Sequence, residues 1–437
     1  MRYIGKLKQY TKELILKLKS EDFYFPYEHR NVSDSLKCYF SVDSLDQITK
    51  NSQYIDSYHE EPTKVSTAVI MDLKENDVTP DLTSYWAQII KSLNYPLWRK
   101  DLSGSGIKVC IIDGNCNFLH EDLIWKHVGF INGPMIDGDS YTDHGTEVLG
   151  ILAAQNNKFG INGLCQDAEI SFASTYNLLD SLLTAGDKLS KGDVIFFECA
   201  LQFNNEHVPV EYADYVYDGI KYCIDKGIIV IEPVGNTNTD LDDLKFGRKF
   251  DRNFRDSGAI FVAAAYIKDD YIGPSGITSY GSRVDICCPG VDITTCGRGD
   301  LVNSTNKNRW YTSSFGGTSV AGAFAGAIAT NISSARKSLG REPLNSLEMR
   351  NILYVNGKNA NTKLPNILVG KFTDVKESLK VAAPIPDLDA DGVVTLQDFW
   401  IFQEYWSDSD LRGDFNDDKA VNINDFFTFV TSFGKTY

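Results

Sequence analysis

Three residues whose side chains can together perform nucleophilic catalysis stand far apart in the chain: Asp113, His144 and Ser319. Ser319 follows a Gly-Gly-Thr turn and begins a run of small and apolar residues that predicts a buried helix. Glycines before the serine allow a sharp turn and leave room at its hydroxyl. The free N–H groups of a first helical turn favour negative charge, so a serine there can attack a carbonyl while an N–H receives the oxyanion. The alternative is a serine that only caps a core helix.

The other two residues stand beside segments that can hold them in place. Asp113 ends the apolar run Ile107 to Asp113, which predicts a buried parallel strand with an acid at its carboxyl end. His144 precedes a run of small and apolar residues, so we expect it at the N-terminus of a second helix, over 147–154. Catalytic groups of parallel α/β sheets gather at the carboxyl edge of the strands, so these residues are candidates for one site.

Strand-like and helix-like segments alternate through the middle of the chain. We expect strands at 169–174, 193–197, 227–231 and 259–265, and helices at 82–97, 178–189, 211–226 and 319–340. Strands that alternate with helices predict an α/β fold in which helices cover both faces of a parallel sheet.

The first 76 residues have a different pattern. Apolar residues at helical spacing within 1–19 predict a surface helix docked on the body, not a secretory signal. Residues 37–42 and 65–71 predict strands, and 45–58 predict a helix. Such a small α+β unit could be a propeptide or a fixed extension, and the sequence leaves both open.

The composition of the 437 residues argues against several classes of protein. A formal net charge of −16 disfavours nucleic acid as the main partner, because phosphates would be repelled. No apolar run is long enough to span a bilayer. The nine cysteines are odd in number and form no Cys-x-x-Cys, which favours buried reduced thiols. Reduced thiols and the lack of a visible signal favour the cytoplasm, whereas the acidic loops described next favour an extracellular location.

A third region, acidic and aromatic, follows the stiff linker Pro384 to Pro386. Residues 387–398 place oxygen ligands at alternate positions, a glycine at the turn and an acid at the twelfth position, which is the spacing of a calcium loop. Residues 414–425 repeat the pattern, and an aromatic helical run follows each copy. The predicted Ca²⁺ ligands are Asp387, Asp389, Asp391, Val393 and Asp398 in the first loop and Asp414, Asn416, Asp418, Ala420 and Asp425 in the second.

The residues around the three catalytic candidates resemble the motifs of the subtilisin-like serine proteases, or subtilases. Val109 to Gly114 is similar to the family's aspartate motif, and His144-Gly-Thr is similar to its histidine motif. Gly317-Thr-Ser319 resembles its serine motif, and Val234-Gly-Asn236 resembles its oxyanion motif. The chain order Asp, His, Ser is the order found in subtilisin.

This resemblance implies a subtilisin-like fold over 77–380 and a serine endopeptidase that hydrolyses polypeptides. Ser319 would be the nucleophile, His144 would take and return its proton, and Asp113 would orient the imidazole. Asn236 would complete an oxyanion hole with the Ser319 N–H.

The sequence departs from the subtilase pattern at two places. Gly322-Ala-Phe324 stands where the family usually has Ala-Pro-His. Glu198-Cys-Ala stands where the family usually has a Ser-Leu-Gly strand that pairs with substrate. We take Glu198, Cys199, Ala200 and Gly235 as candidate substrate-binding residues. Glu198 would favour a basic residue at the cleaved bond, and a carboxylate paired internally is the alternative.

Residues 384–437 resemble a dockerin-type module, which implies Ca²⁺ binding and makes a cohesin-like protein a candidate partner. Lys419 replaces the turn glycine of the second loop. Leu396-Gln397 and Ile423-Asn424 occupy positions at which dockerins often recognise a partner.

The sequence is compatible with two other functions. The chain could be a catalytically inactive subtilase-fold protein that binds a partner in a calcium-dependent way. It could also be an esterase or a peptide ligase built on the same scaffold, because a fold does not fix its function. The sequence does not specify the natural substrate, the oligomeric state or the fate of the N-terminal region.

Overall fold

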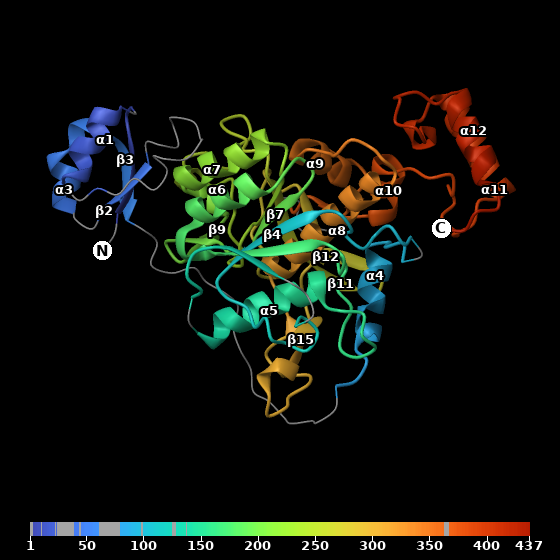
Figure 1. Ribbon diagram of the computed structural model, residues 1–437, viewed down its shortest axis with the longest axis horizontal. Coiled ribbons are helices and arrows are strands. Elements are labelled where there is room, and N and C mark those ends of the chain that lie inside the picture. The colour runs from blue at the N-terminus through green and yellow to red at the C-terminus, as the bar shows by residue number, and fades with distance from the viewer. Residues whose placement is uncertain are drawn as a thin grey trace.

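We analysed a computed structural model of the chain, which describes residues 3–9, 11–21, 23, 39–42, 45–60, 79–97, 99–124, 128–136, 138–361 and 367–437. Three regions follow one another in Figure 1: a small unit at the N-terminus, a large central α/β body, and a helical unit at the C-terminus.

A large sheet runs through the central body. Within the described residues it has ten strands, in the order β16-β17-β13-β11-β10-β7-β4-β6-β5, with β12 paired to β11. The strands are β4 (Lys108–Asp113), β5 (Gly129–Asn132), β6 (Glu169–Ser174), β7 (Val194–Phe197), β10 (Ile229–Pro233), β11 (Ile260–Lys268), β12 (Tyr271–Pro274), β13 (Ile286–Pro289), β16 (Lys358–Asn359) and β17 (Lys371–Phe372). The pairings are parallel except that of β12 with β11 and that of β16 with β17, so the sheet is mixed. The sequence had predicted a parallel sheet, and the two antiparallel strands correct that prediction.

Helices cover the sheet on both faces. The helices of the body are α4 (Ala87–Ser92), α5 (Asp139–Ala153), α6 (Leu178–Lys188), α7 (Asp214–Asp225), α8 (Thr318–Ser338), α9 (Ser346–Val355) and α10 (Val375–Ala382). α5 and α8 pack together, as do α6 and α7, and Figure 1 shows α5 and the α6–α7 pair on opposite sides of β4. The apolar strand runs are buried because each lies between two helical layers.

Two short hairpins lie outside the main sheet. β8 (Leu201–Phe203) pairs with β9 (Glu206–Val208), and β14 (Ile293–Cys296) pairs with β15 (Tyr311–Phe315). The second hairpin leads directly into α8, and α5 packs against β14. It therefore connects the helices that carry His144 and Ser319.

The N-terminal unit has its own sheet and its own core. Its antiparallel strands have the order β2-β1-β3, where β1 is Tyr3–Leu7, β2 is Tyr39–Val42 and β3 is Ile55–Glu60. The helices α1 (Lys12–Lys19) and α3 (Leu45–Lys50) accompany them. A salt bridge of 2.6 Å between Lys6 Nζ and Asp218 Oδ2 connects this unit to α7.

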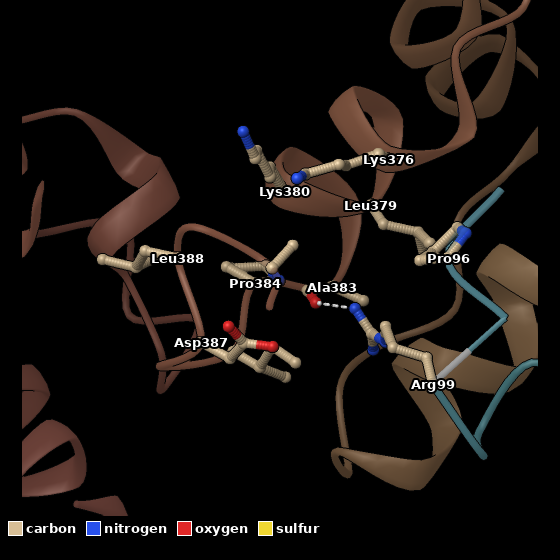
Figure 2. Close-up of a pocket in the computed structure, with 11 residues that line it drawn as sticks. Pro96, Arg99, Lys376, Leu379, Lys380, Ala383, Pro384, Asp387 and Leu388 are labelled. Carbon is tan, nitrogen blue, oxygen red and sulfur yellow. Dashed lines mark hydrogen bonds between the residues drawn. The ribbon is translucent and has the colours of Figure 1, made fainter. Parts of the chain in front are cut away.

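The C-terminal unit consists of two loops, each followed by a helix, and it touches the body. Its helices are α11 (Leu396–Asp408) and α12 (Ile423–Ser432), and Phe402 stacks on Phe429 with 5.4 Å between ring centroids. Figure 2 shows the junction, where Arg99 Nη1 donates to the carbonyl of Ala383 at 3.1 Å beside Pro384 and Asp387.

Most predicted elements of the body are present, but several predictions were wrong. The first nineteen residues contain strand β1 as well as helix α1, and the helix expected over 45–58 ends at Lys50 and is followed by β3. The helix expected over 82–97 is a short 3₁₀ turn followed by α4. The strand expected over 65–71 lies outside the described residues.

The eight cysteines in the described part of the chain are all buried, as the sequence predicted. Burial raises the pKa of the Cys110 thiol to about 12, so this thiol stays protonated at neutral pH.

Candidate active site

Asp113 is held at the carboxyl end of the central strand β4. This strand pairs in parallel with β6 on one side and β7 on the other, so its position is fixed from both sides. The side chain is only 1% exposed, and its Oδ1 accepts a hydrogen bond from the backbone N–H of Gly114. Its Oδ2 lies 2.8 Å from Nδ1 of His144. Both carboxylate oxygens therefore have a defined partner.

His144 connects the aspartate to the serine. Its Nδ1 faces Asp113, and its Nε2 lies 3.0 Å from Oγ of Ser319. The ring of Phe315 packs edge-on against the imidazole, with 5.6 Å between ring centroids. The prediction that His144 lies at a helix N-terminus was wrong, because α5 begins at Asp139 and includes the polar residues before the histidine.

Ser319 lies in the first turn of α8. The N-cap Gly317 has φ +99°, a conformation that side chains rarely adopt. A Cβ on Gly317 would lie 3.0 Å from the side-chain atoms of Asn236, so glycine also lets the turn approach the amide. Ser319 is 9% exposed, whereas His144 is 1% exposed, so the serine is the more accessible of the two residues.

Asn236 follows the carboxyl end of β10 and approaches the start of α8. Its Oδ1 accepts a hydrogen bond of 2.8 Å from the backbone N–H of Thr318. This contact fixes the orientation of the amide and leaves Nδ2 as its donor. Gly235 has φ +101°, and a Cβ there would lie 2.4 Å from the carbonyl oxygen of His207, so Gly235 is required by the backbone turn.

The other predicted substrate-binding residues are buried. Glu198 is 1% exposed, and Cys199 and Ala200 are also buried. Within the described residues neither oxygen of Glu198 makes a hydrogen bond of regular geometry, and the alternative of a carboxylate paired internally stays a prediction. The burial of Glu198 does not fit the predicted contact with a basic substrate side chain.

Sequence reasoning missed the contacts of three groups in this arrangement, although it had noted Gly322 as a departure from the family pattern. The three groups are the Thr318 N–H, which orients Asn236, the Phe315 ring beside His144, and Gly322, which faces Glu198. Thr318 belongs to the Gly-Gly-Thr turn and could have been considered. No local signal indicates the other two, because their partners are distant in sequence.

The acidic loops bring carboxylates together in the C-terminal unit. Oxygens of Asp387, Asp389 and Asp391 lie within 4.8 Å of one another, as do those of Asp414, Asp418 and Asp425. Burial, together with the charge of Asp398, raises the pKa of Asp387 to about 6. Asp398 instead accepts hydrogen bonds from backbone N–H groups, at 2.6 Å from Leu388 and 2.7 Å from Thr395.

The turn position differs between the two loops. Gly392 has φ +96° and Lys419 has φ +68°, so both residues adopt the left-handed conformation. A lysine in this conformation is strained, whereas a glycine is not.

Comparisons with known proteins agree with this geometry. The sequence pattern of the Subtilase family matches residues 104–371, which include Asp113, His144, Asn236 and Ser319. The thermophilic serine proteinase of Bacillus sp. (strain AK1) is 26% identical over 211 residues, covering 45% of this chain and 47% of that protein. The major intracellular serine protease of Bacillus subtilis (strain 168) is 25% identical over 183 residues, covering 40% and 48%. The chain therefore matches less than half of the length of these relatives.

Solved structures show the same fold. Fervidolysin from Fervidobacterium pennivorans, a keratinolytic enzyme related to subtilisin, superposes with a TM-score of 0.59 at 16% identity, covering 88% of this chain and 61% of that one. The epidermin leader peptide processing serine protease of Staphylococcus aureus has a TM-score of 0.60 at 18% identity, covering 87% and 98%.

A parallel α/β core that joins an aspartate, a histidine and a serine by hydrogen bonds defines a serine hydrolase-like site. Because the family pattern spans more than half of the chain, this protein belongs to the subtilase family. No helix among the residues that the structure describes is long and apolar enough to cross a membrane.

Proposed function

We propose that the chain is a serine endopeptidase in which Asp113, His144 and Ser319 form the catalytic triad. The observation that carries this proposal is His144, whose two ring nitrogens contact Asp113 at 2.8 Å and Ser319 at 3.0 Å. This is the geometry of a nucleophile, its base and the group that orients the base.

Each residue has a defined role in peptide hydrolysis. Ser319 Oγ attacks the carbonyl carbon while Nε2 of His144 takes its proton, and the imidazolium then gives that proton to the leaving amine. Asp113 holds the Nδ1–H and stabilises the imidazolium. Water repeats the sequence on the acyl-enzyme, with His144 as the base again.

The oxyanion that forms in both steps needs hydrogen-bond donors already in place. The Nδ2 of Asn236 and the backbone N–H of Ser319 supply them in this proposal. The contact between Thr318 N–H and Asn236 Oδ1, at 2.8 Å, supports it because the amide cannot rotate without losing a hydrogen bond.

The direct test is cleavage of an unstructured protein such as casein and of a fluorogenic peptide library. We expect the wild type to cleave both, and Ser319→Ala to be inactive while its circular dichroism stays native. The inactive binding-protein alternative predicts that neither protein cleaves, and the esterase alternative predicts hydrolysis of a nitrophenyl ester without peptide cleavage.

We also propose that the C-terminal loops bind Ca²⁺. Three converging carboxylates in each loop fit the preference of this hard cation for oxygen ligands. Asp387, Asp389 and Asp391 would hold the first ion, with Asp398 and the carbonyl of Val393 completing the set. Asp414, Asp418 and Asp425, with Asn416 and the carbonyl of Ala420, would hold the second. The bound ion would offset the mutual repulsion of the carboxylates and so stabilise the closed loops.

Contacts with the body support a module that docks on the peptidase domain. Arg336, near the end of α8, makes a salt bridge of 3.1 Å with Asp417 of the second loop. Arg341 donates to the carbonyl of Asp414 at 2.9 Å. The module would therefore fold against the body.

A protein partner for the module is a further element of this proposal. Leu396, Trp400, Ile423 and Phe427 are exposed apolar residues at matching places in the two loop–helix repeats. They could contact a cohesin-like partner, and a pull-down with purified cohesin domains, in calcium and in chelator, would test this.

The N-terminal unit fits either a propeptide or a fixed extension. Its contact with α7 through Lys6 and Asp218 is compatible with both. Sequencing the N-terminus of the active protein from its native source distinguishes them, since a propeptide would be missing from that sample.

A further inference from the structure

One buried carboxyl beside the array has no role in the mechanism above. Glu198 is 1% exposed, and within the described residues neither of its oxygens makes a hydrogen bond of regular geometry. A buried carboxylate without a partner is strongly destabilising, whereas a neutral carboxylic acid in the same place is much less so. Glu198 therefore needs an explanation that the fold alone does not provide.

Glu198 lies near both residues at the ends of the array, because Asp113 and Ser319 each influence its carboxyl. It follows β7, and its backbone N–H donates to the carbonyl of Ile112 at 2.9 Å, which aligns it with the end of β4 beside Asp113. Its carboxyl meets α8, because a Cβ on Gly322 would lie 3.0 Å from its Oε1. Residues three apart share one face of a helix, so Gly322 and Ser319 face the same region.

The two departures from the subtilase pattern, at Glu198 and at Gly322, therefore lie in contact in the folded chain. Any side chain at position 322 would force the Glu198 carboxyl to move by a few tenths of an ångström. Gly322 provides the space that Glu198 fills.

The groups that face Glu198 favour its neutral form. Burial is the largest cause that raises the pKa of Glu198 well above its usual value, and the negative charge of Asp113 on β4 adds to it. The hydroxyl of Ser319 on α8 acts in the opposite direction. His144 on α5 lies between Asp113 and Ser319, and the neighbouring Cys199 thiol is kept neutral by burial. No described lysine or arginine contributes to this site.

We propose that Glu198 is a positioning residue that works as a neutral carboxylic acid and donates a hydrogen bond to Ser319 Oγ. This inference rests on the proposed peptidase function. Ser319 Oγ can accept that hydrogen bond and still donate its own hydrogen to Nε2 of His144. The serine hydroxyl is then directed at its base before substrate arrives.

Loss of the Glu198 proton reverses this arrangement. The carboxylate becomes an acceptor that competes with His144 for the hydroxyl hydrogen of Ser319. It also places a second negative charge beside Asp113. This added charge holds the proton on the imidazole of His144. Activity should therefore fall on the alkaline side as Glu198 ionises.

The experiment is the pH dependence of kcat and KM for wild type, Glu198→Gln, Glu198→Ala and Glu232→Gln. The glutamine at 198 keeps the shape and a donor but cannot ionise. Glu232→Gln is the matched control, because Glu232 is another buried glutamate with a strongly raised pKa, on β10. The rate at which a fluorophosphonate labels Ser319 is measured over the same pH range.

We expect the wild type and Glu232→Gln to lose kcat/KM on the alkaline side, and Glu198→Gln to lack this decline. Glu198→Ala should lower kcat by about 10- to 100-fold at neutral pH, the size of effect that misplacement of a catalytic group produces. An alkaline decline in Glu198→Gln identical to that of the wild type would overturn the proposal. A rise in KM for basic substrates with unchanged kcat would also overturn it, and would assign Glu198 to substrate binding.

A readout that is independent of turnover separates this inference from the proposed function. Infrared difference spectroscopy of wild type against Glu198→Gln at neutral pH should show the carbonyl band of a protonated carboxylic acid. A carboxylate band instead would overturn the inference even in an active peptidase. A chain that the fluorophosphonate labels but that cleaves no peptide contradicts the proposed function, and the pH dependence of its labelling then decides the role of Glu198.

Discussion

Asp113 in the central body and Asp387 in the first C-terminal loop are both buried carboxylates, but they are held in different ways. Asp113 has a backbone N–H on one oxygen and His144 on the other. Asp387 also accepts backbone N–H groups, from Asp391 and Gly392, but its oxygens face those of Asp389 and Asp391 within 4.8 Å. Asp113 is therefore held by protein groups on both oxygens, whereas the loops gather carboxylates whose charge, in the proposal above, a Ca²⁺ ion would balance.

This difference has a consequence for stability. The core site should keep its geometry when divalent cations are removed, because its partners are strands and helices that pack on one another. The loops should open under the same condition, because mutual repulsion of their carboxylates is then unopposed.

The largest expected effect concerns the active site of the central body. Asn236→Ala should lower kcat by about 10²–10³ with little change in KM, a loss of about 2.7–4 kcal/mol; both figures were measured for the oxyanion asparagine of subtilisin, a member of this family. Steady-state kinetics on a fluorogenic peptide measure it. The ratio of wild-type to variant kcat should be the same in calcium and in chelator, and a ratio that shrinks toward one in chelator breaks the comparison.

The loops should lose calcium binding when their ligands are removed. In a Ser319→Ala background, Asp387→Ala with Asp398→Ala should abolish the first binding event in calorimetry, and Asp414→Ala with Asp425→Ala the second. The first event should weaken as the pH falls through about 6, because Asp387, whose pKa is raised to about 6, must be deprotonated to bind. Identical isotherms in wild type and both double variants would contradict the assignment.

A smaller effect concerns how the stability of the core depends on pH through the buried carboxyl group of Glu198. The folded-state pKa of Glu198 lies above its unfolded value, so its favourable contribution is complete at low pH and is lost as pH rises toward the folded pKa. Thermal unfolding should therefore show Glu198→Gln gaining stability over the wild type as the pH increases from about 4 to 9. A difference that is constant across this range would mean that Glu198 has an ordinary pKa.

The smallest expected effect lies within the loops. Lys419→Gly should remove the strain of a left-handed lysine, about 1 kcal/mol, and tighten binding in the second loop several-fold. Gly392→Ala is the matched reverse change, because its φ is +96° and an added Cβ meets no atom within 4 Å. It should weaken binding in the first loop by a similar factor in calorimetry. If both substitutions change calcium affinity in the same direction, or if neither changes it, turn strain does not control the affinity of the loops.

Sequence reasoning succeeded where one pattern ran without interruption. The apolar run ending at Asp113 and the small-residue run after Ser319 each correspond to a buried element, so both ends of the array could be predicted. His144 was assigned to the wrong part of its helix, because the first turn of α5, from Asp139 to Asp143, is polar and gives no periodic signal. Near the N-terminus, a strand and a helix follow so closely that their apolar residues mimic one helical period.

The burial of Glu198 could not be predicted from the sequence, and the reason is a different one. Its burial depends on the glycine at 322, which is 124 positions away in sequence and faces it only in the folded chain. A single sequence presents Glu198 as an acid after a strand, which is the pattern of a cleft residue. The packing of α8 against β7 changes that interpretation.

The central claim is that Asp113, His144 and Ser319 act as one nucleophilic unit. Mass spectrometry of tryptic peptides after treatment with a fluorophosphonate tests it most directly, since the reagent reacts with a serine whose proton a base removes. The account predicts a single adduct on Ser319 in the wild type and almost none in His144→Ala with native circular dichroism. An unlabelled Ser319 in the folded wild type, or labelling that does not depend on His144, would contradict it.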